Sequence, residues 1–256
     1  MITITYVTIT YNAAQVLQRT LDSVLTQDYP HLVHLIIDGA STDGTMEMVN
    51  AYIEQSNAAD NGHRIHVTSE PDKGIYDAMN KGLRSLDGDY VCFLNAGDFL
   101  PAPNTASHIV SAVADRRPAV LYGDTDIVDA EGRFLHHRRL APPENLSWKS
   151  FRQGMLVCHQ AFYARTDFAI ATPYDQQYRY SADVDWCIRV MKAAAKENVP
   201  LLNLHMVVAN YTEEGQTTLH HRESLWERYR VMEHHYGRIQ TFFLHCWFVV
   251  RAVISR

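Results

Sequence analysis

The stretch from 70 to 82 reads Glu70-Pro71-Asp72-Lys73-Gly74-Ile75-Tyr76-Asp77-Ala78-Met79-Asn80-Lys81-Gly82, and it decides the fold class. Three other polar segments stand around it, each at the end of an apolar run of strand type. They are Thr10-Tyr11-Asn12, Asp38-Gly39-Ala40-Ser41-Thr42-Asp43-Gly44-Thr45 and Phe93-Leu94-Asn95-Ala96-Gly97-Asp98. Ligands of open α/β sheets bind beyond the carboxyl ends of the strands. These segments therefore predict the rim of a nucleotide pocket.

Apolar residues in the first hundred positions alternate between the period of a strand and that of a helix. We expect strands at 2–9, 33–37, 64–68 and 90–94, and helices near 14–25, 46–53 and 75–86. Such an alternation predicts an α/β fold with a mostly parallel, Rossmann-like sheet and helices on both faces. The second half predicts a hairpin at 119–139, a helix at 181–195, a last strand at 200–209 and helix from about 224.

The composition excludes several classes of protein. The chain has 256 residues, 46% of them hydrophobic, which is enough for one sizeable core. A formal net charge of -6 argues against nucleic-acid binding, so a bound nucleotide would need local neutralisation. The cysteines are scattered without a CxxC pair, which fits a reducing cytosol; they are Cys92, Cys158, Cys187 and Cys246. We expect no secretory leader and no transmembrane span, and hence a cytoplasmic location.

These motifs resemble those of the family 2 glycosyltransferases, which have the nucleotide-diphospho-sugar transferase (GT-A) fold. The resemblance also includes Cys158-His159-Gln160 and Ala182-Asp183-Val184-Asp185-Trp186. It runs from residue 3 to about residue 190 and is strongest to members that build bacterial surface polysaccharides. It implies a GT-A domain over 1–220, with a nucleotide-sugar-binding half (1–100) and an acceptor-binding half (101–220), followed by a helical extension over 221–256.

The resemblance places the nucleotide-sugar pocket in the first half. Asp38 would hold uridine, because an ionised carboxylate accepts the hydrogen bonds that uracil N3–H and the ribose hydroxyls donate. The alternative is that Asp38 only caps the turn into the next helix, and Asp43 is expected to brace that loop. The other residues expected in the pocket are Thr10, Tyr11, Asn12, Lys73, Gly74, Asp77, Asn80, Asn95, Ala96 and Gly97.

The helix that begins after Gly74 would favour phosphate through its free N–H groups. An alternative interpretation of its first turns is a solvated pair between Asp77 and Lys81. The segment 95–98 occupies the position of the family's D-x-D motif, with Asn95 in place of the first acid. The resemblance implies that Asp98 binds a divalent cation, Mn²⁺ or Mg²⁺, against the diphosphate. A plain polar turn is the alternative.

The family transfers its sugar by single displacement with inversion, so the acceptor hydroxyl needs a carboxylate base. Asp183 matches that base at the start of a helix, although capping alone also places acids there. Asp185 would point elsewhere and cap the helix or brace the loop. His159 and Gln160 are expected to contact a sugar on the acceptor side, or else His159 is an ordinary core histidine.

Two features of the last fifty residues modify this picture. The histidine that many family members place after the last strand is missing from 210–218, unless His220 or His221 replaces it. Aromatic and basic residues then gather in one helical segment, which suits an anionic membrane surface or, alternatively, packing on the core or another subunit. They are Tyr229, Phe242, Phe243, Trp247 and Phe248 with Arg222, Arg228, Arg230, Arg238, Arg251 and Arg256.

The sequence thus predicts an inverting, metal-dependent glycosyltransferase of the hexosyltransferase class in bacterial surface-polysaccharide biosynthesis. It would move a sugar from a UDP-sugar to a hydroxyl of a saccharide or lipid-linked saccharide, in the cytoplasm or at the inner face of the membrane. One alternative is a nucleotide-sugar-binding protein without transfer, which Asn95 and the missing histidine favour. A nucleotidyltransferase would need a glycine-rich basic loop that 8–12 lacks, and a Rossmann dehydrogenase would need G-x-G-x-x-G.

Overall fold

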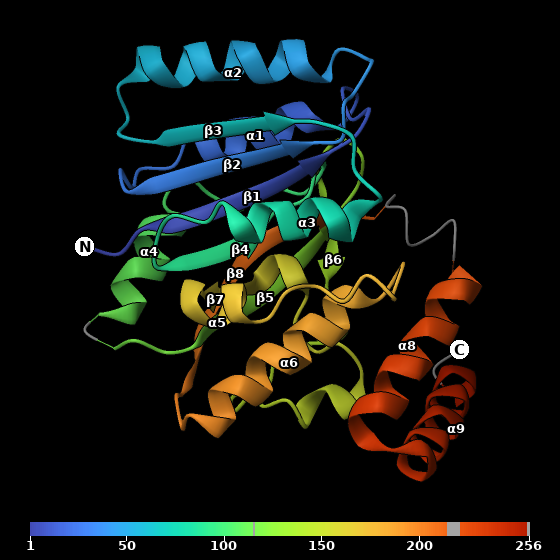
Figure 1. Cartoon of the computed structure of the whole chain (residues 1–256). Coiled ribbons are helices and arrows are strands. Elements are labelled where there is room, and N and C mark those ends of the chain that lie inside the picture. The colour runs from blue at the N-terminus through green and yellow to red at the C-terminus, as the bar shows by residue number, and fades with distance from the viewer. Residues whose placement is uncertain (115, 214–220, 255–256) are drawn as a thin grey trace.

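A computed structural model describes residues 1–114, 116–213 and 221–254 of the chain (Figure 1). One sheet runs through this part of the molecule, with the strand order β3-β2-β1-β4-β7-β5-β6 and with β8 paired to β5. Four parallel strands form its first half, and β1 lies between β2 and β4. Their bounds are β1 (Ile4–Thr10), β2 (Leu32–Asp38), β3 (Arg64–Ser69) and β4 (Tyr90–Phe93).

Helices cover both faces of this parallel half. On one face, Ile36 of β2 packs with residues of α1 (Leu17–Leu25) and α2 (Thr45–Ala59). Its neighbours in β2 belong to the opposite face, where α3 (Ile75–Arg84) packs on β1 and β2. All residues of β1 and β2 are buried, because neither face meets water. The strands and helices predicted for this half are confirmed.

The second half of the sheet is mixed. β7 (Phe162–Arg165) runs antiparallel between β4 and the start of β5 (Val120–Val128), and β6 (Phe134–His137) continues along β5 as the predicted hairpin. β8 (Leu201–Thr212) lies parallel to β5 on the other side. The predicted helix is α6 (Ala182–Lys196). The sequence analysis missed β7, α4 (Thr105–Val113) and α5 (Thr166–Ala171), and the short helices η1 (Ser150–Gln153) and η2 (His159–Ala161).

The predicted C-terminal helical segment forms two helices, α8 (His221–Tyr236) and α9 (Arg238–Ile254), which lie beside the sheet at the lower right of Figure 1. Gly237 joins them with a φ of 85°, a conformation that favours glycine. α8 packs on α6, and α9 packs on α8 and η1. The pair therefore attaches to the second half of the molecule.

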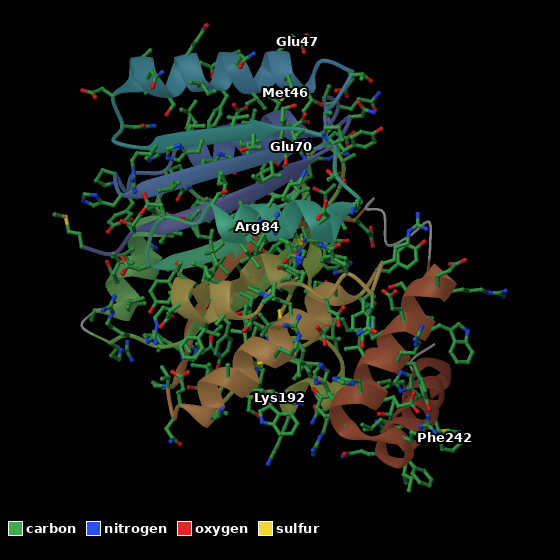
Figure 2. All side chains as sticks on the ribbon, in the orientation of Figure 1. Met46, Glu47, Glu70, Arg84, Lys192 and Phe242 are labelled. Atoms are coloured by element: carbon green, nitrogen blue, oxygen red, sulfur yellow. The ribbon has the colours of Figure 1, made fainter. Side chains whose placement is uncertain are left out.

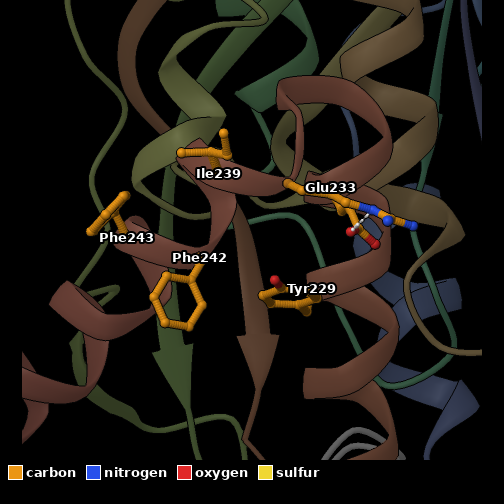
Figure 3. Close-up of a pocket in the computed structure, with 6 residues that line it drawn as sticks. Tyr229, Glu233, Ile239, Phe242 and Phe243 are labelled. Atoms are coloured by element: carbon orange, nitrogen blue, oxygen red, sulfur yellow. Dashed lines mark ion pairs between the residues drawn. The ribbon is translucent and has the colours of Figure 1, made fainter.

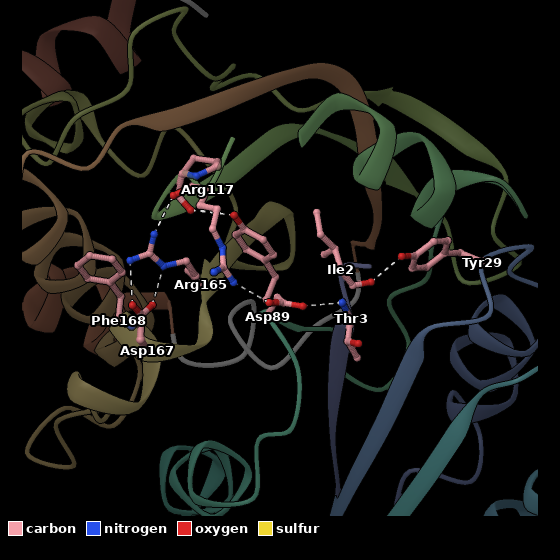
Figure 4. Close-up of polar contacts among 10 residues, drawn as sticks. Ile2, Thr3, Tyr29, Asp89, Arg117, Arg165, Asp167 and Phe168 are labelled. Atoms are coloured by element: carbon pink, nitrogen blue, oxygen red, sulfur yellow. Dashed lines mark hydrogen bonds and ion pairs between the residues drawn. The ribbon is translucent and has the colours of Figure 1, made fainter. Parts of the chain in front are cut away.

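A polar network joins the strands at the amino ends of β1 and β4, opposite the polar loops (Figure 4). Asp89 accepts a hydrogen bond from Thr3 N (2.8 Å) and forms an ion pair with Arg117 (3.0 Å). Arg165, at the end of β7, pairs with Asp167 at 2.8 Å. These contacts stabilise the sheet at the amino ends of β1 and β4. The polar loops lie at the opposite, carboxyl ends of these strands.

Close packing of α3 on β1 yields a testable prediction. A Cβ at Gly82 would lie 2.8 Å from Val7 Cγ1, and Val7 is fully buried. We expect Gly82→Ala to lower the free energy of unfolding by about 1–2 kcal/mol, because the overlap outweighs the gain of about 1 kcal/mol in helix propensity. Urea unfolding would measure this change, with the exposed Arg84→Ala as a control of small effect. A more stable Gly82→Ala protein would contradict the prediction.

Candidate functional site

The buried carboxylate of Asp38, at the end of β2, forms hydrogen bonds with the last residues of β1 and β3. It accepts hydrogen bonds from Thr10 Oγ1 (3.0 Å), from Ser69 Oγ (2.7 Å) and from both N and Oγ of Ser41. Burial raises the pKa of Asp38, but these donors together outweigh burial and hold the pKa below its usual value. Asp38 is therefore an ionised turn cap, as one interpretation of the sequence had it. Its contact with uridine stays a prediction. In that contact, Asp38 would accept from uridine in addition to the two donors of Ser41, or in place of them.

The loop after β1 is braced from the loop after β2. Asn12 takes a left-handed conformation (φ 48°), donates its N–H to Ser41 Oγ and accepts from Thr42 N at 2.9 Å. Asp43 accepts from the backbone of Ala14 and Thr45, which confirms its expected bracing role. Tyr11 stands out from this loop with 67% of its surface exposed. An exposed aromatic ring on a braced loop suits stacking against a nucleobase.

Acidic side chains of the motif at 70–82 fix the segment before α3. Asp77 accepts from Lys73 N (3.1 Å) in the first turn of the helix, and Gly74 has a φ of 117° that favours glycine. Lys81 forms an ion pair with Glu70 at 2.9 Å. The alternative pair between Asp77 and Lys81 is therefore wrong.

Asn80 joins the two halves of the molecule. Its amide group donates to Tyr174 O (2.9 Å) and accepts from Tyr174 N (2.8 Å), and the side chain is buried. This double hydrogen bond holds the loop before α6 against α3. The structure thus shows a bracing role for Asn80, and its contact with a nucleotide-sugar stays a prediction.

Asp98 is buried in the loop after β4, with 5% of its surface exposed. Gln160 Nε2 donates to one carboxylate oxygen (2.6 Å) and Thr212 N, at the end of β8, to the other (3.0 Å). Burial raises the pKa of Asp98 to about 7 in spite of both hydrogen bonds. Within the described part of the chain, Asp98 forms no ion pair, so the protein supplies no positive charge to compensate its carboxylate. Gln160 orients Asp98 here, and its sugar contact stays a prediction.

Asn95, His159 and Asp183 lie in a row. Asn95 Nδ2 is 3.1 Å from His159 Nε2, and His159 Nδ1 is 3.8 Å from Asp183 Oδ2. Because the amide nitrogen donates, Nε2 accepts and the ring proton is assigned to Nδ1, on the side of Asp183. Burial lowers the pKa of His159, and the Asp183 charge offsets this only in part, so the ring is neutral. His159 is buried like a core histidine, and it also faces the candidate base.

Asp183 lies in the first turn of α6, and 21% of its side chain is exposed. Its Oδ1 accepts a hydrogen bond from Tyr76 OH at 3.2 Å. The Tyr76 ring stacks on Tyr174, which in turn stacks on Trp186. This aromatic row supports the carboxylate from inside the core.

Tyr76 is the site residue that the sequence analysis missed. It stands inside the motif at 70–82, next to Asp77, and its apolar neighbours favour a core position. Its place in the first turn of a helix, beside the polar Asp77, was the available signal. Its hydroxyl reaches Asp183 across 107 positions of sequence, which no local pattern can show.

Oxygen ligands for a hard cation are present, but they form no complete set. In the residues that the structure describes, no three His, Cys, Asp or Glu side chains converge on one point. Asp98 supplies an uncompensated carboxylate, and Asn95 Oδ1 is buried without a hydrogen-bond partner. Both groups offer oxygen atoms, the ligand type that a hard divalent cation takes. The late histidine expectation falls on His220, outside the described residues, and on His221, whose side chain is outside them too.

The comparison with known sequences gives one family. The profile described as "Glycosyl transferase family 2" matches residues 5–174. The "PGL/p-HBAD biosynthesis glycosyltransferase" of Mycobacterium bovis (strain BCG / Pasteur 1173P2) is 32% identical over 208 residues, or 80% of this chain and 75% of the relative. An "uncharacterized glycosyltransferase" of Mycobacterium tuberculosis (strain ATCC 25618 / H37Rv) is 31% identical over 191 residues, or 73% of this chain and 68% of the relative.

Solved structures show the same fold. S. aureus TarS 1-349 in complex with UDP-GlcNAc matches with a TM-score of 0.70 and 16% identity, and the match covers 90% of this chain and 64% of TarS 1-349. The mannosyltransferase PcManGT from Pyrobaculum calidifontis, in complex with GDP-Man and Mn²⁺, matches with a TM-score of 0.62 and 19% identity over 89% of this chain and 63% of its own. The GT-A fold is thereby confirmed. Since the family profile matches more than half of its length, the chain belongs to glycosyl transferase family 2.

Proposed function

We propose that this glycosyltransferase moves a sugar from a nucleotide-diphospho-sugar, a UDP-sugar in the first place, to a hydroxyl of a saccharide or lipid-linked saccharide with inversion. The product would belong to bacterial cell-surface polysaccharide. The observation that carries the proposal is the row Asn95–His159–Asp183. This row links Asp183, the candidate base, to the loop that ends in Asp98. In the proposal, Asp183 acts on the acceptor hydroxyl and Asp98 lies on the side of the diphosphate.

Asp183 acts as the base in this proposal. Its Oδ1 is held by Tyr76, and Oδ2 has no hydrogen-bond partner among the described residues other than the longer approach of His159, so Oδ2 is the oxygen for the acceptor hydroxyl. The hydroxyl oxygen bonds to C1 of the sugar while the bond from C1 to the diphosphate breaks. The electron pair of that bond leaves with the diphosphate, and the hydroxyl proton moves to Asp183. Attack opposite to the leaving group inverts the configuration.

Support for the donor comes from chemistry and from relatives. Asp38 is an ionised acceptor at the ends of β1 and β2, which suits the donors of uracil and ribose. TarS binds UDP and UDP-GlcNAc in its solved complexes, and PcManGT binds GDP-Man. A relative's name places that protein in PGL/p-HBAD biosynthesis, so glycosyl transfer in a biosynthetic pathway has a precedent among the relatives. Nucleotide-sugar binding without transfer remains the competing function, favoured by Asn95.

We infer further that Asp98 and Asn95 Oδ1 hold Mn²⁺ or Mg²⁺ together with the donor. A bound divalent cation supplies Lewis-acid stabilisation of the departing diphosphate. The chain's own residues prepare the site, because Gln160 and Thr212 N fix both oxygens of Asp98. A single carboxylate gives the cation little affinity until the diphosphate adds its charge, so metal and donor should bind together.

The helices α8 and α9 are proposed to contact the membrane at its cytoplasmic face. Within the described residues, no helix is both long and apolar enough to span a bilayer. Apolar side chains are nevertheless exposed on this pair, among them Phe242 (56%) and Phe243 (67%). Figure 3 shows these two rings with Ile239 and Tyr229 around a shallow hollow beside the ion pair of Glu233 with Arg238. Exposed aromatics on a helix pair suit the interfacial region of a bilayer.

Cations near these helices favour an anionic surface. Lys149, Arg152 and Lys192 lie 4.9–5.7 Å from the centre of the Trp148 ring. None of the three forms an ion pair with a carboxylate in the described residues. Figure 2 places Lys192 and Phe242 toward the same lower end of the molecule. Arg222 and Arg230 are exposed on α8. Arg256 and the side chain of Arg251 lie outside the described residues.

The base assignment predicts the behaviour of Asp183→Asn. This variant cannot accept the proton, so we expect transfer to fall by about 10²–10⁴-fold while UDP affinity stays within about twofold. The measurement is release of nucleotide diphosphate from UDP-, GDP- and dTDP-sugars with and without Mn²⁺, together with calorimetry of UDP binding. Glu197→Gln at the other end of α6 is the matched control. Turnover at the wild-type rate in Asp183→Asn would refute the assignment, and UDP binding without release from any donor would favour the binding-only function.

The raised pKa of Asp98 predicts a pH-dependent stability of the metal-free protein. An unfolded Asp has a pKa near 3.9, so the folded state holds the proton between about pH 4 and about pH 7. This contribution is fully present below about pH 4 and is lost as the pH rises through about 7, with a size of roughly 4 kcal/mol. Urea unfolding in EDTA at several pH values should show the loss in the wild type and not in Asp98→Asn. Parallel pH profiles of the two proteins would contradict it.

The membrane proposal predicts binding to anionic vesicles. The protein should sediment with vesicles of phosphatidylcholine and phosphatidylglycerol at a 3:1 ratio, and more weakly with phosphatidylcholine alone. Phe242→Ser combined with Phe243→Ser should abolish binding, whereas Ile170→Ser, at an exposed position on α5, should not. Equal sedimentation of all variants would refute the proposal. A change of oligomeric state in the double variant would favour a subunit contact instead.

A further inference from the structure

The segment that leads into α6 is held by a residue of α8. Its N-cap residue, Ser181, makes no side-chain cap hydrogen bond. Instead, the carboxylate of Glu227 on α8 accepts from Arg179 N (2.7 Å), Tyr180 N (2.5 Å) and Ser181 N (2.7 Å). An ionised carboxylate is a strong acceptor for backbone N–H groups. Glu227 thus fixes the three residues that precede α6, although it lies 46 positions beyond Ser181 in the chain.

A second anchor lies on the other side of Asp183. The buried carboxylate of Asp185 pairs with Arg189 on its own helix (2.6 Å) and accepts from His235 Nε2 on α8 (2.8 Å). Lys192 donates to the other nitrogen of the His235 ring at 2.9 Å, which fixes the tautomer. The lowered pKa of Asp185 reflects these partners, which outweigh the opposing effect of burial. Asp183 therefore lies between two segments that α8 holds.

We propose that Glu227 is a positioning residue of the transfer reaction, through which the C-terminal helix α8 sets the place of Asp183 at the start of α6. The inference rests on the proposed role of Asp183 as the base. Glu227 acts on the backbone before the helix and not on the reacting atoms. Its three hydrogen bonds hold 179–181, and that segment sets where the first turn of α6 begins. The helix α8 then helps to position the base, in addition to its proposed contact with the membrane.

The candidate site is divided between the two halves of the molecule, so an effect on the base can be measured separately from an effect on donor binding. Asp38, Tyr11 and Asp98 belong to loops of β1, β2 and β4, which Glu227 does not contact. Loss of these three hydrogen bonds should therefore shift the base while the donor pocket keeps its form. A misplacement of about 1 Å at a reacting group costs on the order of 10²-fold in rate. The expected signature is a fall in kcat with an unchanged KM for the donor.

Steady-state kinetics of three variants test the proposal. Glu227→Ala should lower kcat by about 10–100-fold with the donor KM within about twofold. Glu227→Gln keeps one carbonyl acceptor and should recover part of kcat. Tyr236→Phe removes another hydrogen bond of α8, to Trp148 O (2.6 Å), and should leave kcat near the wild-type value. If Glu227→Ala does not fold, the comparison of Glu227→Gln with Tyr236→Phe carries the test.

The outcomes separate this inference from the proposed function. Asp183→Asn is measured in parallel. If Asp183→Asn is inactive and the Glu227 variants match Tyr236→Phe in kcat, the positioning role is overturned and the base assignment stands. If Asp183→Asn is fully active, the base assignment fails and the inference fails with it. A low kcat that Glu227→Gln partly restores, at constant donor KM, supports both.

Discussion

The buried carboxylate of Asp98 is the constraint on which the site depends. It follows β4 in the first half of the chain, and both of its oxygens are held by the second half, through Gln160 and Thr212. Thr20 of α1 donates to its backbone carbonyl at 2.7 Å, so three elements meet at one residue. A buried carboxyl without a compensating cation is costly. Such a residue is retained at functional sites, where a ligand supplies the missing charge.

The rest of the site is built across the same boundary between the halves. Tyr76 and Asn95 come from the first half and reach Asp183 and His159 in the second. Stacked rings of the core fill the space beneath them, so the polar groups at the surface of the core have fixed positions. The C-terminal helices add a third contribution, because α8 holds both ends of the turn that carries Asp183. In the proposed function, the donor would therefore bind to one part of the chain while another part holds the proposed base in place.

The sequence predicted the parallel half of the sheet well, because its strands and helices are long and strongly periodic. It missed β7 and α5, which are four and six residues long and follow each other directly. Segments of this length show no clear period. The acids at strand and helix ends were found, since they stand in short motifs. Their partners were not, and Asn80 and Gln160 show bracing roles that spacing alone does not reveal.

The sequence by itself determined the family, the GT-A fold and the set of polar residues that line the carboxyl ends of the strands. These follow from local periodicity and from motifs, which are properties of neighbouring residues. Only the tertiary structure decided which of those residues face one another, because the deciding contacts join positions far apart. Tyr76 and Asp183 are separated by 107 positions, and Asp98 and Thr212 by 114. Such pairs form only when packing of the core has brought α3, α6, β4 and β8 together.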